Sequence, residues 1–209
     1  MRRPLVLALL VFASPALAQS GGAVSAELKA LADADQADRQ ANMDGTMPWS
    51  VVAAADSMRL ARVEALTGAG RLRTGADLYH AALVFQHDIT PYSLYRAYTL
   101  SRRAYEEDGN EDARWLVPRA YDRWQQSIGR PQVYGTQAFG SPRDTTDHDP
   151  TDNSGAELVW SLGNADLDAV SDEERARWGI RPAAAVREMI ECLNTTGDFE
   201  RCDAAWKGE

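Results

Sequence analysis

Apolar residues recur along most of this chain at the three- and four-residue spacing of amphipathic helices. The pattern predicts helices over residues 23–41 and 49–67, the second of which ends at Gly68. A third helix starts after Thr74, because Thr74 and Asp77 have the spacing of a capping box. This helix continues to the Gln-His pair that precedes Asp88.

Two further helices are predicted in the middle of the chain. Thr90 has the side chain of an N-cap residue, and Pro91 suits the first helical position. That helix runs to about Asp108. The next spans roughly 111–128, and Pro118 should kink it because proline lacks the N–H group that the helix needs. Helices joined by such short turns pack antiparallel, so we expect α-hairpins that loosely resemble tetratricopeptide pairs, although no 34-residue repeat occurs.

The C-terminal third is less regular. Residues 140–156 are polar and acidic without any periodic pattern, which predicts a mobile surface loop. Residues 157–162 alternate between apolar and polar types and could form one short strand. A short helix should run from Ser171 to Trp178, and a longer one over 182–193. The predicted fold class is therefore all-α, with antiparallel helix pairs, a long acidic loop and at most one short β segment.

The N-terminus has the pattern of a secretory signal peptide. Arg2 and Arg3 precede an apolar run over residues 5–13, and an Ala-x-Ala site ends at Ala18. Residues 1–18 are therefore predicted to be removed. No later apolar run reaches the length of about 20 residues that spans a bilayer, so no membrane contact is expected after cleavage.

The remaining residues, 19–209, are predicted to form a single helical domain in which 157–209 are a C-terminal extension. Removal of 18 residues from 209 leaves 191, with 20 basic and 31 acidic side chains and a net charge of −11. This charge argues against nucleic acid and anionic membranes as partners, because both require a basic surface. The abundance of Arg and Ala is typical of a high-GC bacterium, so the predicted location is periplasmic or secreted.

Cys192 and Cys202 are the only cysteines in the chain. In an oxidising compartment such a pair usually forms a disulfide, and the Gly197-Asp198 turn signal between them would let the chain fold back. A redox or metal-binding pair is the alternative, but the spacing is not C-x-x-C.

The segment 129–137, GRPQVYGTQ, concentrates groups that form directional hydrogen bonds. Pro131 forces the preceding residue out of helical geometry, and Gly135 permits a turn that most residues resist. Such a rigid loop could be a structural plug that satisfies helix ends, or it could recognise a ligand. The side chains concerned are Gln132, Tyr134 and Gln137.

His80 and His87 are seven residues apart on one helix, which separates them by about 10 Å along its axis. Because this spacing is too long for joint coordination of one ion, no metal site is predicted. Each histidine could instead be hydrogen-bonded near the core. Alternatively, one of them could act as a general base whose ring is oriented by Asp77 or Asp122.

Charged residues on other helices could complete a site. Asp35 and Arg39 lie four residues apart and can form an ion pair. Arg39 and Arg123 could grip a carboxylate or phosphate group of a ligand. Equally, they could pair with Asp35, Asp56 or Asp122 in a buried network.

Several of these segments together resemble a bacterial domain family of unknown function. Its pattern is a Q-H pair on a helix, then D-R, then G-x-P-Q-x-Y-G-T-Q, and finally R-x-x-x-G-x-x-P. The resemblance covers about residues 25–190. It implies an all-helical domain whose polar motif residues lie close together in space. Because the family has no established activity, the resemblance implies none for this chain. Asp88 stands where the family has Gly after Gln-His, which predicts a different end to that helix. The matching residues are 35–39, 86–88, 122–124, 129–137 and 171–186.

The leading functional hypothesis is a binding module for a small polar ligand or a protein partner, without a cofactor. One alternative is a hydrolase or transferase with His80 or His87 as general base and Asp122 as a further candidate catalytic residue. Another is a purely structural polar network. The predicted ligand-binding residues are Arg39, Gln86, His87, Arg123, Gln132, Tyr134 and Gln137.

Overall fold

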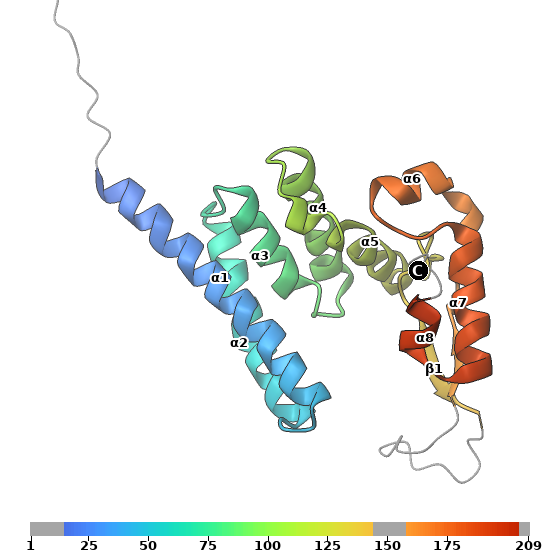
Figure 1. The fold of residues 1–209 in the computed structure, drawn as a ribbon. Helices are drawn as coiled ribbons and strands as arrows, with labels where there is room; N and C mark the ends of the chain where they lie inside the picture. Colours follow the sequence, from blue (N-terminus) through green and yellow to red (C-terminus); the bar gives the residue numbers. More distant parts are fainter. Residues whose placement is uncertain (1–14, 144–157, 205–209) are drawn as a thin grey trace, which may run out of the picture.

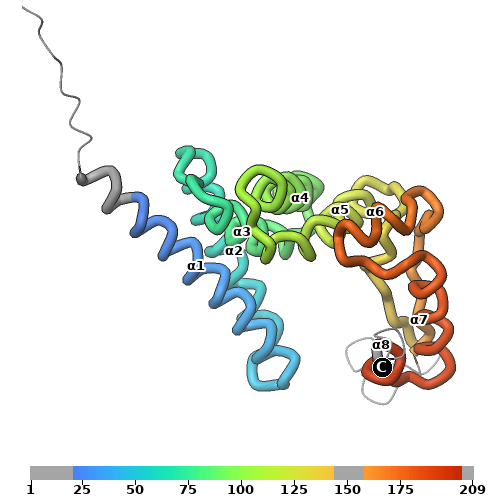
Figure 2. Tube along the Cα trace, turned by 45° about the horizontal axis from the view of Figure 1, so that its top comes forward, coloured from blue at the N-terminus to red at the C-terminus, as the bar shows by residue number. Residues whose placement is uncertain are grey.

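A computed structural model of the chain describes residues 15–143 and 158–204. It is mostly helical and is built from packed helix pairs, as the hydrophobic pattern predicts. Figures 1 and 2 both show helices α1 to α4 at one end, the C-terminal elements at the other, and α5 between them. The first elements are α1 (Pro15–Met43), α2 (Trp49–Gly68), α3 (Gly75–Phe85), α4 (Pro91–Glu106), the 3-10 turn η1 (Glu111–Ala113) and α5 (Leu116–Ser127).

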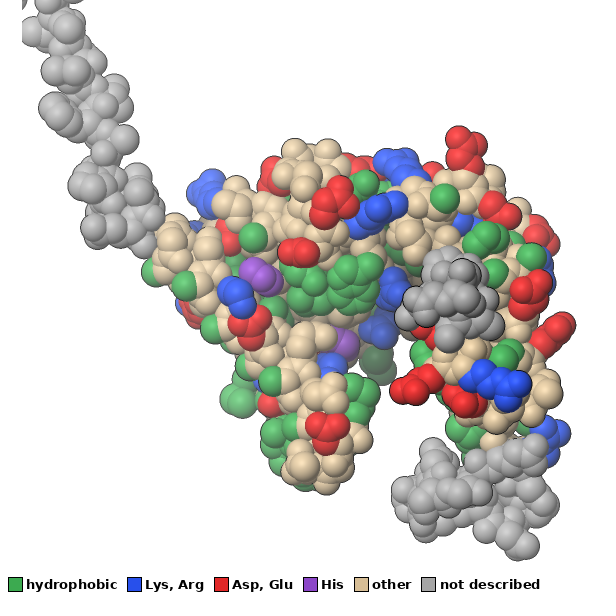
Figure 3. Space-filling view, in the orientation of Figure 1, with side chains coloured by type: hydrophobic (Ala, Val, Ile, Leu, Met, Phe, Trp, Pro, Cys, Tyr) green, Lys and Arg blue, Asp and Glu red, His purple; other side chains and the backbone are tan. Residues whose placement is uncertain are grey.

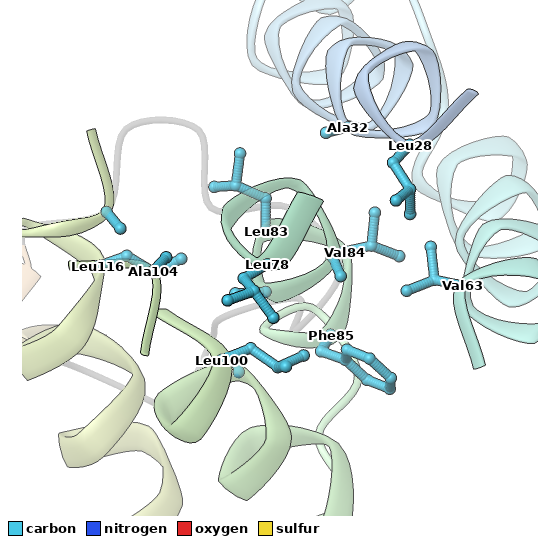
Figure 4. Packing of buried hydrophobic residues seen from close by; sticks show 14 of the residues in the cluster. Leu28, Ala32, Val63, Leu78, Leu83, Val84, Phe85, Leu100, Ala104 and Leu116 are labelled. Carbon is cyan, nitrogen blue, oxygen red and sulfur yellow. The ribbon is translucent and has the colours of Figure 1, made fainter. Parts of the chain in front are cut away.

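Helix α3 is the centre of the main hydrophobic core because it packs against α1, α2 and α4. In Figure 4, Leu28, Val63 and Val84 point toward one another on one side of α3, and Leu78 faces Leu100 on the other. Each fully buried side chain of this size contributes about 1.5–3 kcal/mol. The core therefore fixes the end of α3, where the Gln-His pair lies.

Local signals in the sequence set several helix ends. Thr74 accepts a hydrogen bond from the backbone N–H of Asp77, whose carboxylate accepts one from the backbone of Thr74, so the predicted capping box is confirmed. Thr90 caps α4, and Pro91 occupies its first turn. These caps satisfy backbone groups that the helices leave without partners.

The predicted helix over 111–128 is wrong in its first part. The chain forms η1 and then starts α5 at Leu116, which puts Pro118 in the first turn of the new helix. No N–H group is needed there, so Pro118 starts a helix rather than kinking one.

The C-terminal part contains a two-stranded antiparallel sheet. The expected strand over 157–162 is present as β2, and it pairs with β1, whose Phe139 lies opposite Ser161. Residues 140–142 of the predicted loop are therefore in a strand, while 144–157 lie outside the described residues. The sequence of β1, FGSP, has no alternating pattern that could predict it. The elements are β1 (Phe139–Pro142), β2 (Leu158–Ser161), η2 (Leu167–Ala169), α6 (Asp172–Arg177), α7 (Ala183–Thr196) and α8 (Phe199–Ala204).

The predicted signal peptide lies mostly outside the described residues, which begin at residue 15. Within the described part of the chain, no helix has both the length and the apolar character needed to cross a bilayer.

The predicted disulfide between Cys192 and Cys202 is confirmed, and it ties α8 to α7. Gly197 lies between these helices with a φ of 68°, a left-handed conformation that glycine adopts without strain. The short α8 was not predicted from the sequence.

Reduction of this disulfide is expected to lower the free energy of unfolding by about 2–3 kcal/mol, because the crosslink closes only a short loop in the unfolded chain. Urea unfolding with and without a phosphine reductant measures the loss. In the double variant Cys192→Ser/Cys202→Ser, the reductant should have no further effect. Equal stability of the oxidised and reduced proteins would contradict the expectation.

Candidate functional site

A network of ion pairs joins α1 to α2. Asp35 and Arg39 lie one turn apart on α1 and form the predicted pair, with 2.9 Å between Oδ1 and Nη1. Arg39 also contacts Asp56 of α2 at 2.8 Å. Arg59, one turn beyond Asp56, binds that carboxylate at 2.9 Å and Asp38 at 2.7 Å. The sequence analysis missed Asp38 and Arg59, although the three-residue spacing of Asp56 and Arg59 is a signal for pairing.

His87 lies directly beyond the end of α3 and faces this network. Its Nε2 is buried without a hydrogen-bond partner among the described residues, 3.4 Å from Oδ2 of Asp35. Burial, together with the positive charges of Arg39 and Arg123, lowers the pKa of His87 to about 3. Burial also raises the pKa of Asp35 to about 6, despite the neighbouring Arg39. The imidazole of His87 is therefore neutral at physiological pH.

Arg123 reaches the same region from α5. Its Nε donates to Oε1 of Gln137 at 2.9 Å, and its Nη1 donates to the backbone oxygen of Gln86 at 3.1 Å. No carboxylate among the described residues forms an ion pair with Arg123. Its pKa is lowered by burial and by the positive charges of Arg39 and Arg119. Arg123 is thus a largely buried cation that no described carboxylate pairs with, and two glutamines hold it in place.

The loop over 129–137 is held by Asp122, which is fully buried. Oδ1 of Asp122 accepts hydrogen bonds from the backbone N–H groups of Val133 and Tyr134, at 2.9 and 3.1 Å. Oδ2 accepts from the N–H and the hydroxyl of Thr136, at 3.0 and 2.8 Å. Both oxygens of Asp122, a candidate catalytic group, are therefore engaged in shaping the loop.

Gln132 and Tyr134 also support the loop from inside. Gln132 is fully buried, donates to the carbonyls of Gln137 and Leu162, and accepts from the N–H of Gln137. Tyr134 packs in a second apolar cluster with Val117 and Trp178. For these two side chains the geometry matches a structural plug rather than a ligand-recognition surface.

Close packing and a buried arginine complete the loop. Gly135 has a φ of 69°, and a Cβ there would lie 2.8 Å from Leu167 and 2.9 Å from Val186. Only glycine fits this position. Arg175 of α6, which is fully buried, donates to the backbone oxygens of Val133, Tyr134 and Leu167. The sequence analysis missed Arg175, because nothing in the surface-like pattern of α6 predicts its burial.

His80 lies apart from this region. Four charged residues influence the pKa of His80, namely Lys29, Asp33, Asp77 and Asp112. None of them is among the main contributors to the pKa shift of His87. Figure 3 shows the two described histidines as separate patches. His80 is therefore not part of the region that His87 shares with Arg39 and Arg123.

The structure brings five of the predicted ligand-binding residues together and keeps Gln132 and Tyr134 in supporting positions. Figure 3 shows a hollow between the α1–α2 hairpin and the C-terminal part, with Lys or Arg side chains and one histidine at its inner end. We call the five residues the polar cluster. They are Arg39, Gln86, His87, Arg123 and Gln137.

A small pocket of about 170 Å³ adjoins the polar cluster at His87. Trp49 and Leu60 of α2 and Ile89 of the α3–α4 turn give it apolar walls, and Asp56 adds a carboxylate. Trp49 and Ile89 are 59% and 87% exposed, so the rim is open to solvent. In residues 15–143 and 158–204, no group of three or more His, Cys, Asp or Glu side chains is arranged to hold a metal ion.

The family resemblance of residues 25–190 rests on the sequence motifs alone. The polar cluster draws on three of these motifs, namely 35–39, 86–88 and 122–124, and on Gln137 from the end of a fourth. Comparisons of the chain with protein-family models, with curated proteins and with solved structures find no match, so the resemblance stays a prediction.

Proposed function

We propose that the polar cluster binds the carboxylate group of a small acid or of a peptide C-terminus. The observation that carries this proposal is the state of Arg123. It is a largely buried guanidinium whose surroundings contribute further positive charge, and no described carboxylate offsets it. Burying a charge without a partner is costly, so such a position favours an anion supplied from outside.

The geometry of Arg123 suits a planar anion. Gln137 and Gln86 engage Nε and Nη1, while Nη2 makes no hydrogen bond to any described residue and is not fully buried. Nη2 therefore has N–H groups left to donate to an oxygen of the anion, and the two glutamines hold the guanidinium in one orientation. Little side-chain entropy then remains to be lost on binding.

The size of the pocket restricts the rest of the ligand. At about 170 Å³ it is smaller than the sites of about 300–1,000 Å³ that enclose drug-sized molecules. It suits one side chain or a few carbon atoms against Trp49, Leu60 and Ile89. A short peptide with a free C-terminus meets both requirements, and so does a small monocarboxylic acid with a short apolar chain. A periplasmic location, suggested by the signal pattern and the disulfide, would expose the protein to both.

The electrostatics argue against a hydrolase or transferase that uses His87 as general base. An efficient base at neutral pH has a pKa near 7, whereas burial and neighbouring arginines hold the pKa of His87 near 3. Asp122 has no oxygen left for substrate. The binding proposal needs neither residue to exchange a proton.

Arg123→Gln is expected to weaken carboxylate binding by about 10- to 100-fold, the usual worth of one charge-assisted hydrogen-bonding group. Calorimetric titration of the full chain with butyrate and with acetylated trialanine measures this. The C-terminal amide of the same peptide should bind at least about tenfold more weakly than the acid, because it lacks the negative charge.

Arg130→Gln is the matched control, since it removes an exposed arginine of the same loop. It should leave the affinity unchanged. Gln137→Ala should weaken binding while leaving the melting temperature nearly unaltered. Equal affinity of the wild type and Arg123→Gln for both acids would exclude the polar cluster as their site. Absence of binding, with a large loss of stability in Gln137→Ala, would favour a purely structural network.

A further inference from the structure

A second and larger pocket, of about 360 Å³, lies in the C-terminal part of the protein. Figures 1 and 2 show α8 beside α7 there. Val186, Met189 and Ile190 of α7 form one apolar wall, and Phe199 of α8 forms another. The volume falls within the usual range of about 300–1,000 Å³ for small-molecule sites. None of its lining residues belongs to the polar cluster.

Two guanidinium groups and one carboxylate line this apolar pocket. Arg181 is paired with Asp203, which α8 carries directly after the disulfide-bonded Cys202. Arg119 of α5 has no acidic partner among the described residues. Its Nη1 donates to the backbone oxygen of Trp115 at 2.7 Å, and its guanidinium lies over the ring of that residue. Among the described residues that line the pocket, positively charged side chains thus outnumber negatively charged ones by one, and Arg119 is the one without an ion-pair partner.

A ligand with an apolar chain and one negatively charged end would complement the apolar walls and the Arg119 guanidinium of this pocket. The apolar wall of α7 would remove a hydrocarbon chain from water, at about 25 cal/mol for each Å² buried. Arg119 would supply the partner for a carboxylate, in surroundings where burial and Arg181 lower its pKa although Asp122 acts in the opposite direction. A neutral or cationic head group would leave that guanidinium without an anionic partner in the pocket.

We propose that this pocket binds an amphipathic monocarboxylate of the medium-chain fatty acid class, with its carboxylate on Arg119 and its chain along α7. None of the residues that line this site belongs to the polar cluster. The two sites are nevertheless close enough for the positive charge of Arg119 to act on Arg123. Gly135 and Thr136 also line the pocket, so Asp122, which accepts a hydrogen bond from Thr136, helps to shape this second site.

Titration of the full oxidised chain with decanoate tests the proposal, with decanol and decylammonium as ligands of the same chain length. Decanoate should bind saturably at one site and at least about tenfold more tightly than either. Arg119→Gln should reduce decanoate affinity to that of decanol without changing decanol binding. Ala138→Trp alters an exposed residue of the lining, and it should abolish binding of both by filling the pocket.

Arg130→Gln is the matched control, and it should keep full affinity for decanoate. Arg123→Gln should reduce that affinity much less than Arg119→Gln does, because Arg123 does not line the pocket. Loss of decanoate binding in Arg123→Gln, with none in Arg119→Gln, would place the fatty acid at the polar cluster and overturn the proposal. Equal affinities for decanoate and decanol would also overturn it, as would the absence of saturable binding.

Discussion

Asp122→Ala is expected to lower the free energy of unfolding by about 4 kcal/mol. The side chain is fully buried and accepts four hydrogen bonds, three of them from backbone N–H groups of the loop over 129–137. Each buried donor left without an acceptor costs about 1–3 kcal/mol. Partial relaxation of the loop keeps the total below the simple sum. Urea unfolding followed by circular dichroism measures the loss.

Asp122→Asn and Asp168→Ala are the controls for this prediction. The asparagine keeps the shape and one acceptor oxygen, but its amide N–H₂ would meet a donor, so about half of the loss is expected. Asp168 is also an ion-pair partner, of Arg187, but its side chain is 79% exposed. Its removal should cost under about 1 kcal/mol. A loss below 1 kcal/mol in Asp122→Ala would show that the loop does not depend on this carboxylate.

His87→Gln is expected to change how stability depends on pH. The pKa of His87 is about 3 in the folded protein and about 6.5 in the unfolded chain. Between these values the unfolded chain binds a proton that the folded protein does not, so this group costs stability as the pH falls. Asp35, with its pKa raised to about 6, acts in the opposite direction below that pH and masks the effect in the wild type.

The difference in unfolding free energy between His87→Gln and the wild type isolates the histidine. From pH 7 to pH 5 it should move in favour of the variant by about 2 kcal/mol, at about 1.4 kcal/mol for each pH unit below 6.5. From pH 8 to pH 7 it should stay constant, which is an internal control. A shift in favour of the wild type on acidification would mean that His87 takes up a proton and pairs with Asp35, 3.4 Å away.

The sequence by itself determined those features that depend on neighbouring residues. The capping box of Thr74 and Asp77 and the proline start of α4 are local hydrogen-bonding and steric effects. The pair of Asp35 and Arg39 follows from the pitch of one helix. The apolar stripes likewise predict the helical fold, because each stripe must be buried against another helix.

Only the tertiary structure decided which polar groups are buried together. Whether His80 or His87 joins Arg123 depends on how α1, α3 and α5 pack, and no local pattern carries that information. The pairing of β1 with β2 and the burial of Asp122 and Arg175 likewise join residues far apart in sequence. A charged residue has the same local pattern on a solvated face as in a buried network, and only its neighbours in space distinguish the two.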